Sequence, residues 1–577
     1  MKVIFKHIHK IELILLIGII LDVIGQIALE LKMPEYSAKL STLITSQNIA
    51  MSDVWYNGGM MVLCAFLSLI LAIGNAFLIS SFSARITASI RDDIFTKVST
   101  FSLAELNKFE TSSLITRNTN DVVQIQNFLG MGTGLLFRAP ITAIWAICKI
   151  SKSHPYWTIS TAVSIGIIVL VVAIVVVIAL PKFKKIQALT DELNLRSREN
   201  MQGVRVIRAF DANTYQTNKF EETNNNVYKN NLFVSLVTGA MMPIITLVME
   251  GLTLAIYYFG AYIIDGADIS EKADRLGDMT AFSSYALQVV MAFMMLIMIF
   301  MLLPRVLVSL KRINEVLETT PSIVDGNVNN EIHEGNIEFK DVSFSYLGDD
   351  KYSISNISFS VNKGETLAII GPTGSGKSTI ANLINRSYDV TSGEILIDGV
   401  NVKDYKLSDL NKRVSIAHQK AMLFKGSVES NITYGNNEKD CEKLKKVIDI
   451  SQSNFISDLN GIDTEVSQGA TNLSGGQKQR LSIARALYKD SDIFIFDDTF
   501  SALDFKTDQM VRLGIKENYS DKTVIIIAQR IGTVKNADKI IVLDDGKIDS
   551  IGTHDELMKR SKLYQEIALS QLEKEEL

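Results

Sequence analysis

Six apolar runs, each long enough to cross a lipid bilayer, occupy the first half of this 577-residue chain. A hydrocarbon core of ~30 Å requires about 20 residues of helix, because a helix satisfies its own backbone polar groups in lipid. The sequence therefore predicts a helical transmembrane domain with six membrane helices. The runs lie at Ile11–Leu31, Trp55–Ile79, Phe128–Ile150, Trp157–Leu180, Leu232–Ile264 and Met279–Leu303.

Basic residues predict how these helices are oriented. Lysine and arginine concentrate between the second and third runs and again between the fourth and fifth, whereas Asp265–Asp278 is acidic. Because basic loops stay in the cytoplasm, we expect a multi-pass cell-membrane protein with both termini and both basic segments cytoplasmic. Short outer loops are expected near Pro34–Asp53, Ser151–Pro155 and Asp265–Asp278.

The two basic segments are too polar to cross a membrane and too periodic to be irregular. They indicate helical extensions that turn at Glu110–Asn118 and at Asp211–Tyr215. About twenty extra helical residues would reach ~30 Å beyond the membrane. Such extensions would connect the membrane helices to a soluble domain, although ordinary cytoplasmic loops are the simpler alternative.

The second half of the chain contains a phosphate-binding motif in the context that the motif requires. Residues 371–379 match G-x-x-x-x-G-K-[ST], between the apolar strand Thr366–Ile370 and an apolar helix at Ile380–Asn385. Backbone N–H groups of such a loop surround phosphate oxygens, Lys377 would reach the β- and γ-phosphates, and Ser378 would bind Mg²⁺. The predicted nucleotide-binding residues here are Gly371, Thr373, Gly374, Ser375, Gly376, Lys377, Ser378 and Thr379.

These patterns predict the domain organisation. Residues 1–317 form the transmembrane domain, 318–334 form a polar linker, and 335–577 form an α/β P-loop nucleotide-binding domain. Asn336–Phe344 and Ile493–Phe496 are further expected strands.

Leu473-Ser474-Gly475-Gly476-Gln477 adds a second, specific motif. Together with Tyr346, Gln419, Asp497 and Ser501–Asp504, it resembles the ATP-binding cassette transporters. The resemblance covers the whole chain and is that of an exporter-type half-transporter. It is strongest to the bacterial heterodimeric multidrug exporters.

The resemblance implies roles for these residues. Tyr346 would stack on adenine, while Gln419 and Asp497 would contact Mg²⁺. Two cassettes would face head to tail, so that each ATP lies between one chain's phosphate loop and the other chain's signature. The signature residues Ser474, Gly475, Gly476 and Gln477 would therefore close on ATP held by a second half-transporter. Turns near Ser112–Arg117 and Asp211–Tyr215 would match the coupling helices.

Two positions depart from the family pattern. Asp498 stands where a glutamate would orient the attacking water, and Gln529 stands where a histidine would face the γ-phosphate. Aspartate is one methylene shorter, and glutamine cannot become cationic or shuttle a proton. Both changes affect hydrolysis and neither affects nucleotide retention, which predicts a site that binds ATP and splits it slowly. Neutral drift in a working site is the alternative.

The intact signature suggests what the departures mean. If both composite sites were inactive, nothing would require Ser474–Gln477. We therefore hypothesise a heterodimer in which the partner's phosphate loop, with its own glutamate and histidine, uses this signature for fast hydrolysis.

The cargo is less constrained. Asp22, Arg138 and Glu250 lie inside apolar runs, where an unpaired charge is costly and each is a candidate for the substrate pathway. Met295 belongs to a methionine stripe, a soft surface that suits varied ligands. Together they suggest a small amphipathic or lipophilic substrate. Interhelical ion pairs and ordinary packing are the alternatives.

Other functional classes remain open. An importer built on an exporter-like fold would share these features, and an ATP-gated channel or regulatory subunit would suit weak hydrolysis. The net charge of −5 does not favour nucleic acid as a partner. The expected partners are thus a lipid bilayer, a second half-transporter and a small substrate, with ATP and Mg²⁺ as cofactors.

Overall fold

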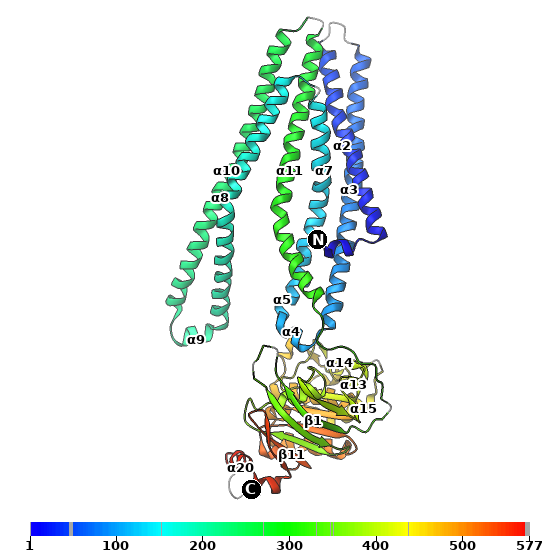
Figure 1. Ribbon diagram of the computed structural model, residues 1–577, viewed down its shortest axis with the longest axis vertical. Helices are drawn as coiled ribbons and strands as arrows, with labels where there is room; N and C mark the ends of the chain where they lie inside the picture. The colour runs from blue at the N-terminus through cyan, green and yellow to red at the C-terminus, as the bar shows by residue number, and fades with distance from the viewer. Residues whose placement is uncertain are drawn as a thin grey trace. The chain divides into compact units, whose positions relative to one another are not determined.

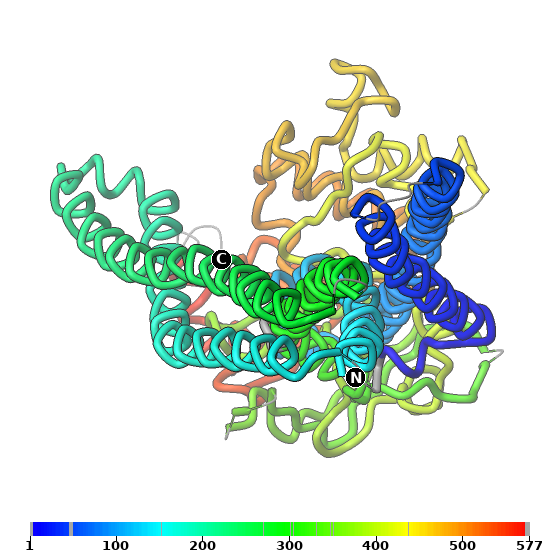
Figure 2. Tube along the Cα trace, turned by 90° about the horizontal axis from the view of Figure 1, so that it is seen from above, coloured from blue at the N-terminus to red at the C-terminus, as the bar shows by residue number. Residues whose placement is uncertain are grey.

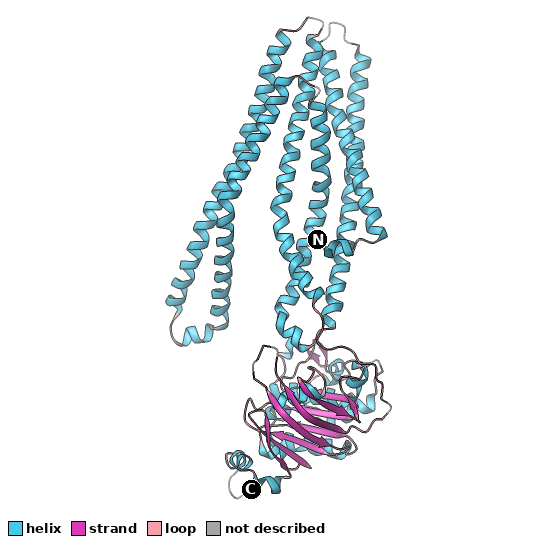
Figure 3. Cartoon of the chain, viewed as in Figure 1, coloured by secondary structure: helices cyan, strands magenta, loops and turns pink. Residues whose placement is uncertain are grey.

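The computed structural model describes residues 2–45, 50–151, 153–268, 271–330, 332–346, 348–349, 351–436 and 438–571. These residues form two compact units. The helical unit comprises Met1–Thr96 and Ile115–Glu318, and the α/β unit comprises Lys97–Leu114 and Thr319–Leu577. Strands occur in the α/β unit, as Figure 3 shows.

Six helices in the described part of the chain are long and apolar enough to span a membrane, which confirms the predicted number. They are α2 (Lys10–Thr45), α3 (Met51–Ser99), a composite third helix, α8 (Pro155–Gln202), α10 (Asn213–Asp265) and α11 (Lys272–Glu318). A short helix, α1 (Lys2–Lys6), comes before α2. Each predicted run lies inside one of these helices (Figure 1).

The third membrane helix alternates between α- and π-helical turns. It comprises α5 (Thr111–Thr116), the π-segment η1 (Arg117–Asp121), α6 (Val122–Asn127), the π-segment η2 (Phe128–Gly132) and α7 (Thr133–Ile150). Polar contacts hold η1 to α11: Arg117 donates to the Arg312 carbonyl oxygen and to Glu315, and Asp121 accepts from Ser309 at 2.9 Å.

Helices α8 and α10 lie side by side along their lengths and are joined by α9 (Val204–Ala209), as Figures 1 and 2 show. The chain turns at 210–212, where Asp211 has a φ of 49°. The predicted second turn, Asp211–Tyr215, therefore begins correctly but ends too late, because α10 starts at Asn213.

The first predicted turn, Glu110–Asn118, is wrong. The chain reverses around α4 (Leu103–Phe109), and residues from Thr111 onward are helical. Ser102 and Glu105 form a capping box that starts α4, and Glu110 takes a φ of 56° at its end. Arg117, at the end of this segment, is held to α11 by its hydrogen bonds to the Arg312 carbonyl oxygen and to Glu315. Ser112–Arg117, where the resemblance placed a turn matching a coupling helix, therefore lies within α5 and the start of η1.

The outer loops are also shorter than predicted. Helix α2 continues past Pro34 to Thr45, where Thr42 bonds the Ala38 and Ala273 carbonyls. Helix α11 begins at Lys272, inside the segment expected to be a loop until Asp278. The connection between α7 and α8 falls at 151–154, within the predicted Ser151–Pro155.

The described strands of the α/β unit form three sheets. One has the order β2-β1-β4-β5, with β1 (Ile337–Phe344), β2 (Ile354–Val361), β4 (Ser392–Ile397) and β5 (Val400–Asn401). The central sheet has the order β12-β11-β3-β10-β9-β6, with β3 (Thr366–Ile370), β6 (Val414–Ala417), β9 (Ile493–Asp497), β10 (Thr523–Ile527), β11 (Lys539–Asp544) and β12 (Lys547–Gly552). The short strands β7 (Gly426–Ser427) and β8 (Glu465–Val466) pair separately.

The strands of the central sheet pair in parallel, apart from the antiparallel pair β11–β12, and β3, β9 and β10 are buried on both faces. Continuous apolar runs such as Thr366–Ile370 suit such strands, because helices cover both faces of a parallel sheet. The longer helices of the unit are α12 (Lys377–Ile384), α13 (Leu407–Arg413), α15 (Cys441–Ile450), α16 (Gly475–Tyr488), α17 (Phe505–Asn518), α19 (His554–Arg560) and α20 (Lys562–Leu569). Short helices lie at α14 (Val428–Ile432), α18 (Ile531–Val534), η3 (Asn454–Asp458), η4 (Gly461–Asp463), η5 (Gln468–Ala470) and η6 (Thr499–Ala502).

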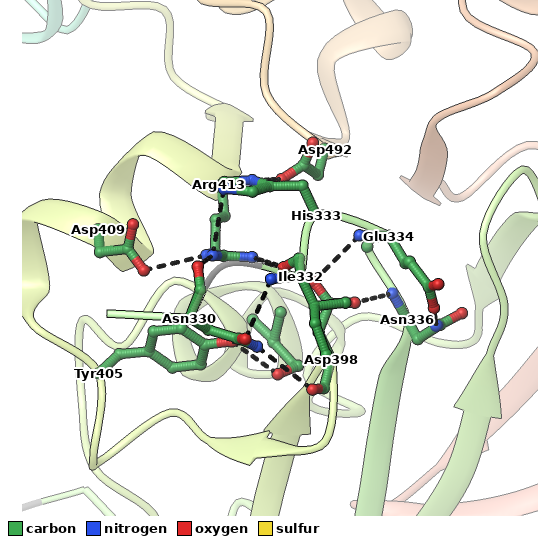
Figure 4. A network of polar contacts seen from close by, with 12 residues as sticks. Asn330, Ile332, His333, Glu334, Asn336, Asp398, Tyr405, Asp409, Arg413 and Asp492 are labelled. Atoms are coloured by element: carbon green, nitrogen blue, oxygen red, sulfur yellow. Dashed lines mark hydrogen bonds and ion pairs between the residues drawn. The ribbon is translucent and has the colours of Figure 1, made fainter. Parts of the chain in front are cut away.

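The segment that follows α11, from Thr319 onward, is hydrogen-bonded to the rest of the α/β unit. Arg413, which is 1% exposed, donates to the carbonyl oxygens of Asn330 and Ile332 and to Asp398 (Figure 4). The Arg386 guanidinium donates to the Val324 carbonyl at 2.9 Å. A buried charge is costly unless it has hydrogen-bond partners. The carbonyl oxygens of this segment therefore stabilise the buried guanidinium groups, and the guanidinium groups fix the segment in place.

Candidate nucleotide-binding site

The phosphate loop follows β3 and ends at the N-terminus of α12. Gly376 is the N-cap of α12 and has a φ of 93°. A Cβ atom at this position would lie 2.8 Å from the Ser353 carbonyl oxygen, so only glycine fits the turn and the close approach. The N–H groups of the α12 N-terminus are consequently available to an anion.

Lys377 is folded back into this loop. Its Nζ donates to the carbonyl oxygens of Gly371 at 2.8 Å and Pro372 at 2.6 Å. Burial lowers the pKa of the Lys377 ammonium, while the nearby carboxylates of Asp498 and Asp497 oppose that shift. The ammonium group is thus held where an arriving phosphate would replace its carbonyl partners.

Ser378 and Asp497 bring two oxygen ligands together. The Ser378 hydroxyl donates to Asp497 Oδ1 at 2.8 Å, across the junction between α12 and the end of β9. Burial raises the pKa of Asp497, and the Ser378 hydrogen bond partly offsets this effect. A hydroxyl and a carboxylate are oxygen donors that Mg²⁺ accepts, so the pair fits that ion.

Asp498 and Gln529, the two residues that depart from the family pattern, contact each other. Gln529 Nε2 donates to Asp498 Oδ2 at 3.1 Å, and Gln419 Nε2 donates to the same oxygen at 2.9 Å. Asp498 is 8% exposed and has a φ of 49°. Two side-chain amides therefore occupy one carboxylate oxygen.

A cavity of about 390 Å³ lies beside these residues. From the phosphate loop, Thr373, Gly374 and Gly376–Thr379 line it, whereas Gly371 and Ser375 do not. Gln419, Gln529 and Tyr346 also line it, and the Tyr346 hydroxyl lies 3.1 Å from Thr379 Oγ1. Lys377, Ser378, Gln419 and Gln529 thus share one cavity with the aromatic ring predicted to bind the base.

Sequence reasoning missed part of this lining. Tyr352 and Ser353 come from the loop before β2, and Asp545 and Gly546 form the turn between β11 and β12. An Asp-Gly pair between two apolar strands is a recognisable hairpin signal. Nothing in that signal indicates a ligand, because the cavity arises from tertiary packing.

The signature residues lie on a different element. Ser474 is the N-cap of α16 and forms a capping box with Gln477, whose N–H donates to Ser474 Oγ at 3.3 Å. Ser474 and Gly475 are exposed, while Gly476 packs against the Ala502 carbonyl. Among the described residues that line the cavity, none belongs to Ser474–Gln477. The signature is therefore an exposed helix N-terminus outside this chain's own cavity.

The four membrane candidates fall into different environments. Arg138 donates two hydrogen bonds to Glu30, at 2.7 and 2.8 Å, so it belongs to an interhelical ion pair. Asp22 Oδ2 is buried without a hydrogen-bond partner among the described residues. Glu250 is exposed on α10, and Met295 is half-buried on α11.

Two family descriptions match this chain. Residues 13–301 match the ABC transporter transmembrane region, and residues 354–501 match the ABC transporter domain. The chain belongs to the ABC transporter family.

Curated relatives cover almost the whole chain. An uncharacterised ABC transporter ATP-binding protein of Bacillus subtilis is 33% identical and covers 97% of both chains. One of Mycobacterium tuberculosis is 33% identical and covers 93% of both. The ATP-dependent lipid A-core flippase of Haemophilus influenzae is 29% identical over 84% of this chain and 82% of its own.

A solved structure has the same fold. The structure of a bacterial Atm1-family ABC exporter with ATP bound superposes with a TM-score of 0.81, covers 97% of this chain and 98% of its own, and is 24% identical. The chain is therefore a multi-pass membrane protein with an exporter-type helical domain and an ATP-binding domain. Its ATPase activity is coupled to transport.

Proposed function

We propose that this ABC transporter chain forms one subunit of a heterodimeric exporter and that its own phosphate loop retains ATP and hydrolyses it slowly. The observation that supports this most strongly is the pair of amides on Asp498. Gln419 and Gln529 both donate to Asp498 Oδ2, the oxygen that would otherwise be free to assist an attacking water.

A general base must reach the proton that it removes. Asp498 is shorter than glutamate by one methylene, and its Oδ2 already accepts two hydrogen bonds. Gln529 is a neutral donor and cannot supply the positive charge that would stabilise charge at the γ-phosphate. The changes at Asp498 and Gln529 leave Lys377 and Ser378, the groups that hold the nucleotide, unaltered. ATP can therefore be retained at a site where its hydrolysis is slow.

Ser378 and Asp497 would hold Mg²⁺, and Gln419, which lines the same cavity as Ser378, would contact it. The 2.8 Å hydrogen bond between the first two shows that their oxygens converge. When bound, the ion would neutralise charge on the β- and γ-phosphates.

A second chain is suggested by surfaces that one chain leaves uncovered. At the end of the α8–α10 pair, Met201, Val206, Phe210 and Tyr215 are each more than 60% exposed. On the α/β unit, Met422, Phe424 and Tyr434 form an exposed apolar patch in which two rings stack at 4.7 Å. Apolar patches of this kind favour protein contact, and we propose that the α9 tip of each subunit docks on this patch of the other.

The signature motif is intact, whereas the hydrolytic residues are altered. This difference favours a partner that is a different chain over a partner that is a second copy of this chain. The signature is complete, capped and exposed, whereas the hydrolytic pair is altered. A partner with glutamate and histidine at the corresponding positions would hydrolyse ATP against Ser474–Gln477. This chain would contribute a retained ATP.

The cargo that we propose is a small amphipathic or lipophilic compound. Met295 is half-buried on the apolar helix α11, and Asp22 Oδ2 is a buried carboxylate oxygen that has no hydrogen-bond partner among the described residues. Several relatives are named as flippases of lipid A-core, an amphipathic substrate class. The α/β unit and both termini are assigned to the cytoplasm, in keeping with the basic segments.

The test is the identity of the retained nucleotide. Purified complex is incubated with Mg²⁺ and ATP labelled on the base, washed, and its nucleotide is extracted and separated. The proposal predicts one ATP per copy of this chain after turnover has begun, and loss of that ATP in Lys377→Ala. Extraction of ADP alone would contradict it.

A further inference from the structure

Helix α4 is part of the α/β unit and is fixed there by a buried polar joint. Glu105 accepts hydrogen bonds from the Ser102 hydroxyl at 2.6 Å and from the Ser322 backbone N–H at 3.1 Å. The hydroxyls of Ser102 and Ser322 lie 2.9 Å apart. Burial raises the pKa of Glu105, but the hydrogen bonds from Ser102 and Ser322 outweigh it and lower the pKa overall. One end of α4 is therefore fixed to the segment that leaves α11.

The other end of α4 contacts an aromatic cluster next to the cavity. Asn107 Nδ2 donates to the Tyr388 hydroxyl at 3.2 Å. The Tyr388 ring meets the Tyr346 ring edge-on, with centroids 5.3 Å apart, and Phe344 lies 4.8 Å from Tyr346 and 5.4 Å from Tyr388. Tyr388 is therefore the residue that touches both α4 and the Tyr346 ring.

Tyr346 is oriented from two sides. Its hydroxyl meets Thr379 on α12, and its ring rests against Tyr388 and Phe344. An edge-to-face aromatic pair restricts the tilt of both rings. A base that stacks on Tyr346 must therefore either fit the tilt that Tyr388 sets or displace Tyr388.

We propose that Tyr388 is a positioning residue that holds the Tyr346 ring in the orientation that the nucleotide base needs. Through its hydrogen bond with Asn107, Tyr388 also couples binding of the base to the stability of α4. This inference rests on the base-stacking role proposed for Tyr346. The phosphates are bound separately by Lys377 and the α12 N-terminus, so this contact depends on the base and not on the triphosphate. The ring provides the positioning, and the hydroxyl provides the link to α4.

Hydrogen–deuterium exchange of α4 in the purified complex tests the link. We expect ATP to slow exchange at residues 103–109 and inorganic tripolyphosphate to leave it unchanged. Tyr388→Phe keeps the ring and removes the acceptor, and Asn107→Ala removes the donor, so each variant abolishes the slowing. The matched control is Lys108→Ala, an exposed neighbour on α4 that keeps the Asn107–Tyr388 bond and therefore keeps the slowing.

Nucleotide affinity tests the positioning role. Tyr388→Leu removes the edge-to-face contact and is expected to weaken ATP binding by roughly two- to tenfold, the usual worth of such a pair, without changing tripolyphosphate binding. Tyr388→Phe is expected to bind ATP as the native chain does. The fold-change thus separates the ring from the hydroxyl.

Two exchange results would overturn the inference. One is equal protection of α4 by tripolyphosphate and ATP, and another is protection that persists in both Tyr388→Phe and Asn107→Ala. If Tyr346→Ala weakens ATP binding while these variants change nothing, the relay alone fails. If Tyr346→Ala leaves ATP affinity unchanged, the base-stacking role proposed for Tyr346 fails as well.

Discussion

Changing Asp498 and Gln529 together should raise hydrolysis at this site far more than changing either alone. Asp498→Glu extends the carboxylate by one methylene, about 1.5 Å. In that variant the Gln529 amide would still donate to the carboxylate and would still be unable to become cationic. Gln529→His alone would supply a titratable ring but leave the carboxylate short.

The magnitude follows from the two hydrogen bonds on Asp498 Oδ2, at 2.9 and 3.1 Å. A hydrogen bond to a charged group contributes roughly 1.5–3 kcal/mol, and every ~1.4 kcal/mol corresponds to about tenfold in rate. An oxygen that must lose one amide before it assists water is therefore slowed by about 10- to 100-fold. We expect at most about tenfold gain for each single variant and about 100-fold or more for the pair, within the 10²–10⁴-fold range of general-base assistance.

The assay is phosphate release by the purified complex under saturating Mg²⁺ and ATP. Each variant is compared with the same variant carrying Lys377→Ala, which removes turnover at this chain's phosphate loop and leaves the partner's site. A full gain from Asp498→Glu alone would refute the role given to Gln529. An unchanged rate in the double variant would refute the role given to both residues.

Three further predictions concern the signature, the α4 joint and the membrane pair. Ser474→Ala removes the α16 N-cap, a loss of about 1 kcal/mol, and should slow phosphate release at least tenfold while ATP retention at Lys377 persists, as extraction of bound nucleotide would show. Because the pKa of Glu105 is lowered in the folded chain, its stabilising effect is present above its usual value of 4.5 and is lost as the pH falls through the folded-state value. The protection factor of α4, which corrects the exchange rate for the intrinsic pH dependence of amide exchange, should fall over that range and should lose this pH dependence in Glu105→Gln. Arg138→Ala should lower the free energy of unfolding by about 2–3 kcal/mol, because the Glu30 carboxylate then lacks its ion-pair partner among the membrane helices. Adding Glu30→Ala to this variant should recover part of the loss, as thermal unfolding of both variants would show.

The membrane helices and the central strands could be predicted from the sequence because their signals are local. Long apolar runs have few alternatives to membrane helices, and β3 coincides with the predicted Thr366–Ile370. The first turn could not be placed because polar residues at Glu110–Asn118 suggested an irregular segment. Contacts from α11 to Arg117 and Asp121 keep that segment helical, and those contacts join residues almost 200 positions apart.

In the nucleotide site, too, local motifs could be predicted from the sequence, whereas contacts between distant segments could not. The phosphate loop is one continuous motif, and its residues Thr373, Gly374 and Gly376–Thr379 line one cavity. The contact of Gln419 and Gln529 with a single oxygen of Asp498 joins three separate segments and appears in no motif. Tyr388 and Asn107 belong to no motif either, so only the fold reveals that they meet.

The pairing of Arg138 with Glu30 shows why charged residues in membrane helices are hard to interpret from sequence. Each residue alone resembles a substrate ligand, because a lone charge in lipid is costly. The two hydrogen bonds between α2 and α7 supply the partner that the sequence does not reveal. Asp22, whose Oδ2 lacks such a partner among the described residues, keeps its standing as a substrate-pathway candidate.

The most direct test of the two-chain account is to purify this chain alone, reconstitute it in lipid vesicles, and measure ATP hydrolysis together with transport of an amphipathic dye. The account predicts retained ATP with little hydrolysis and no transport, and recovery of both activities when a partner with glutamate and histidine at the altered positions is added. A homodimer of this chain that hydrolyses ATP rapidly and couples it to transport would contradict the account.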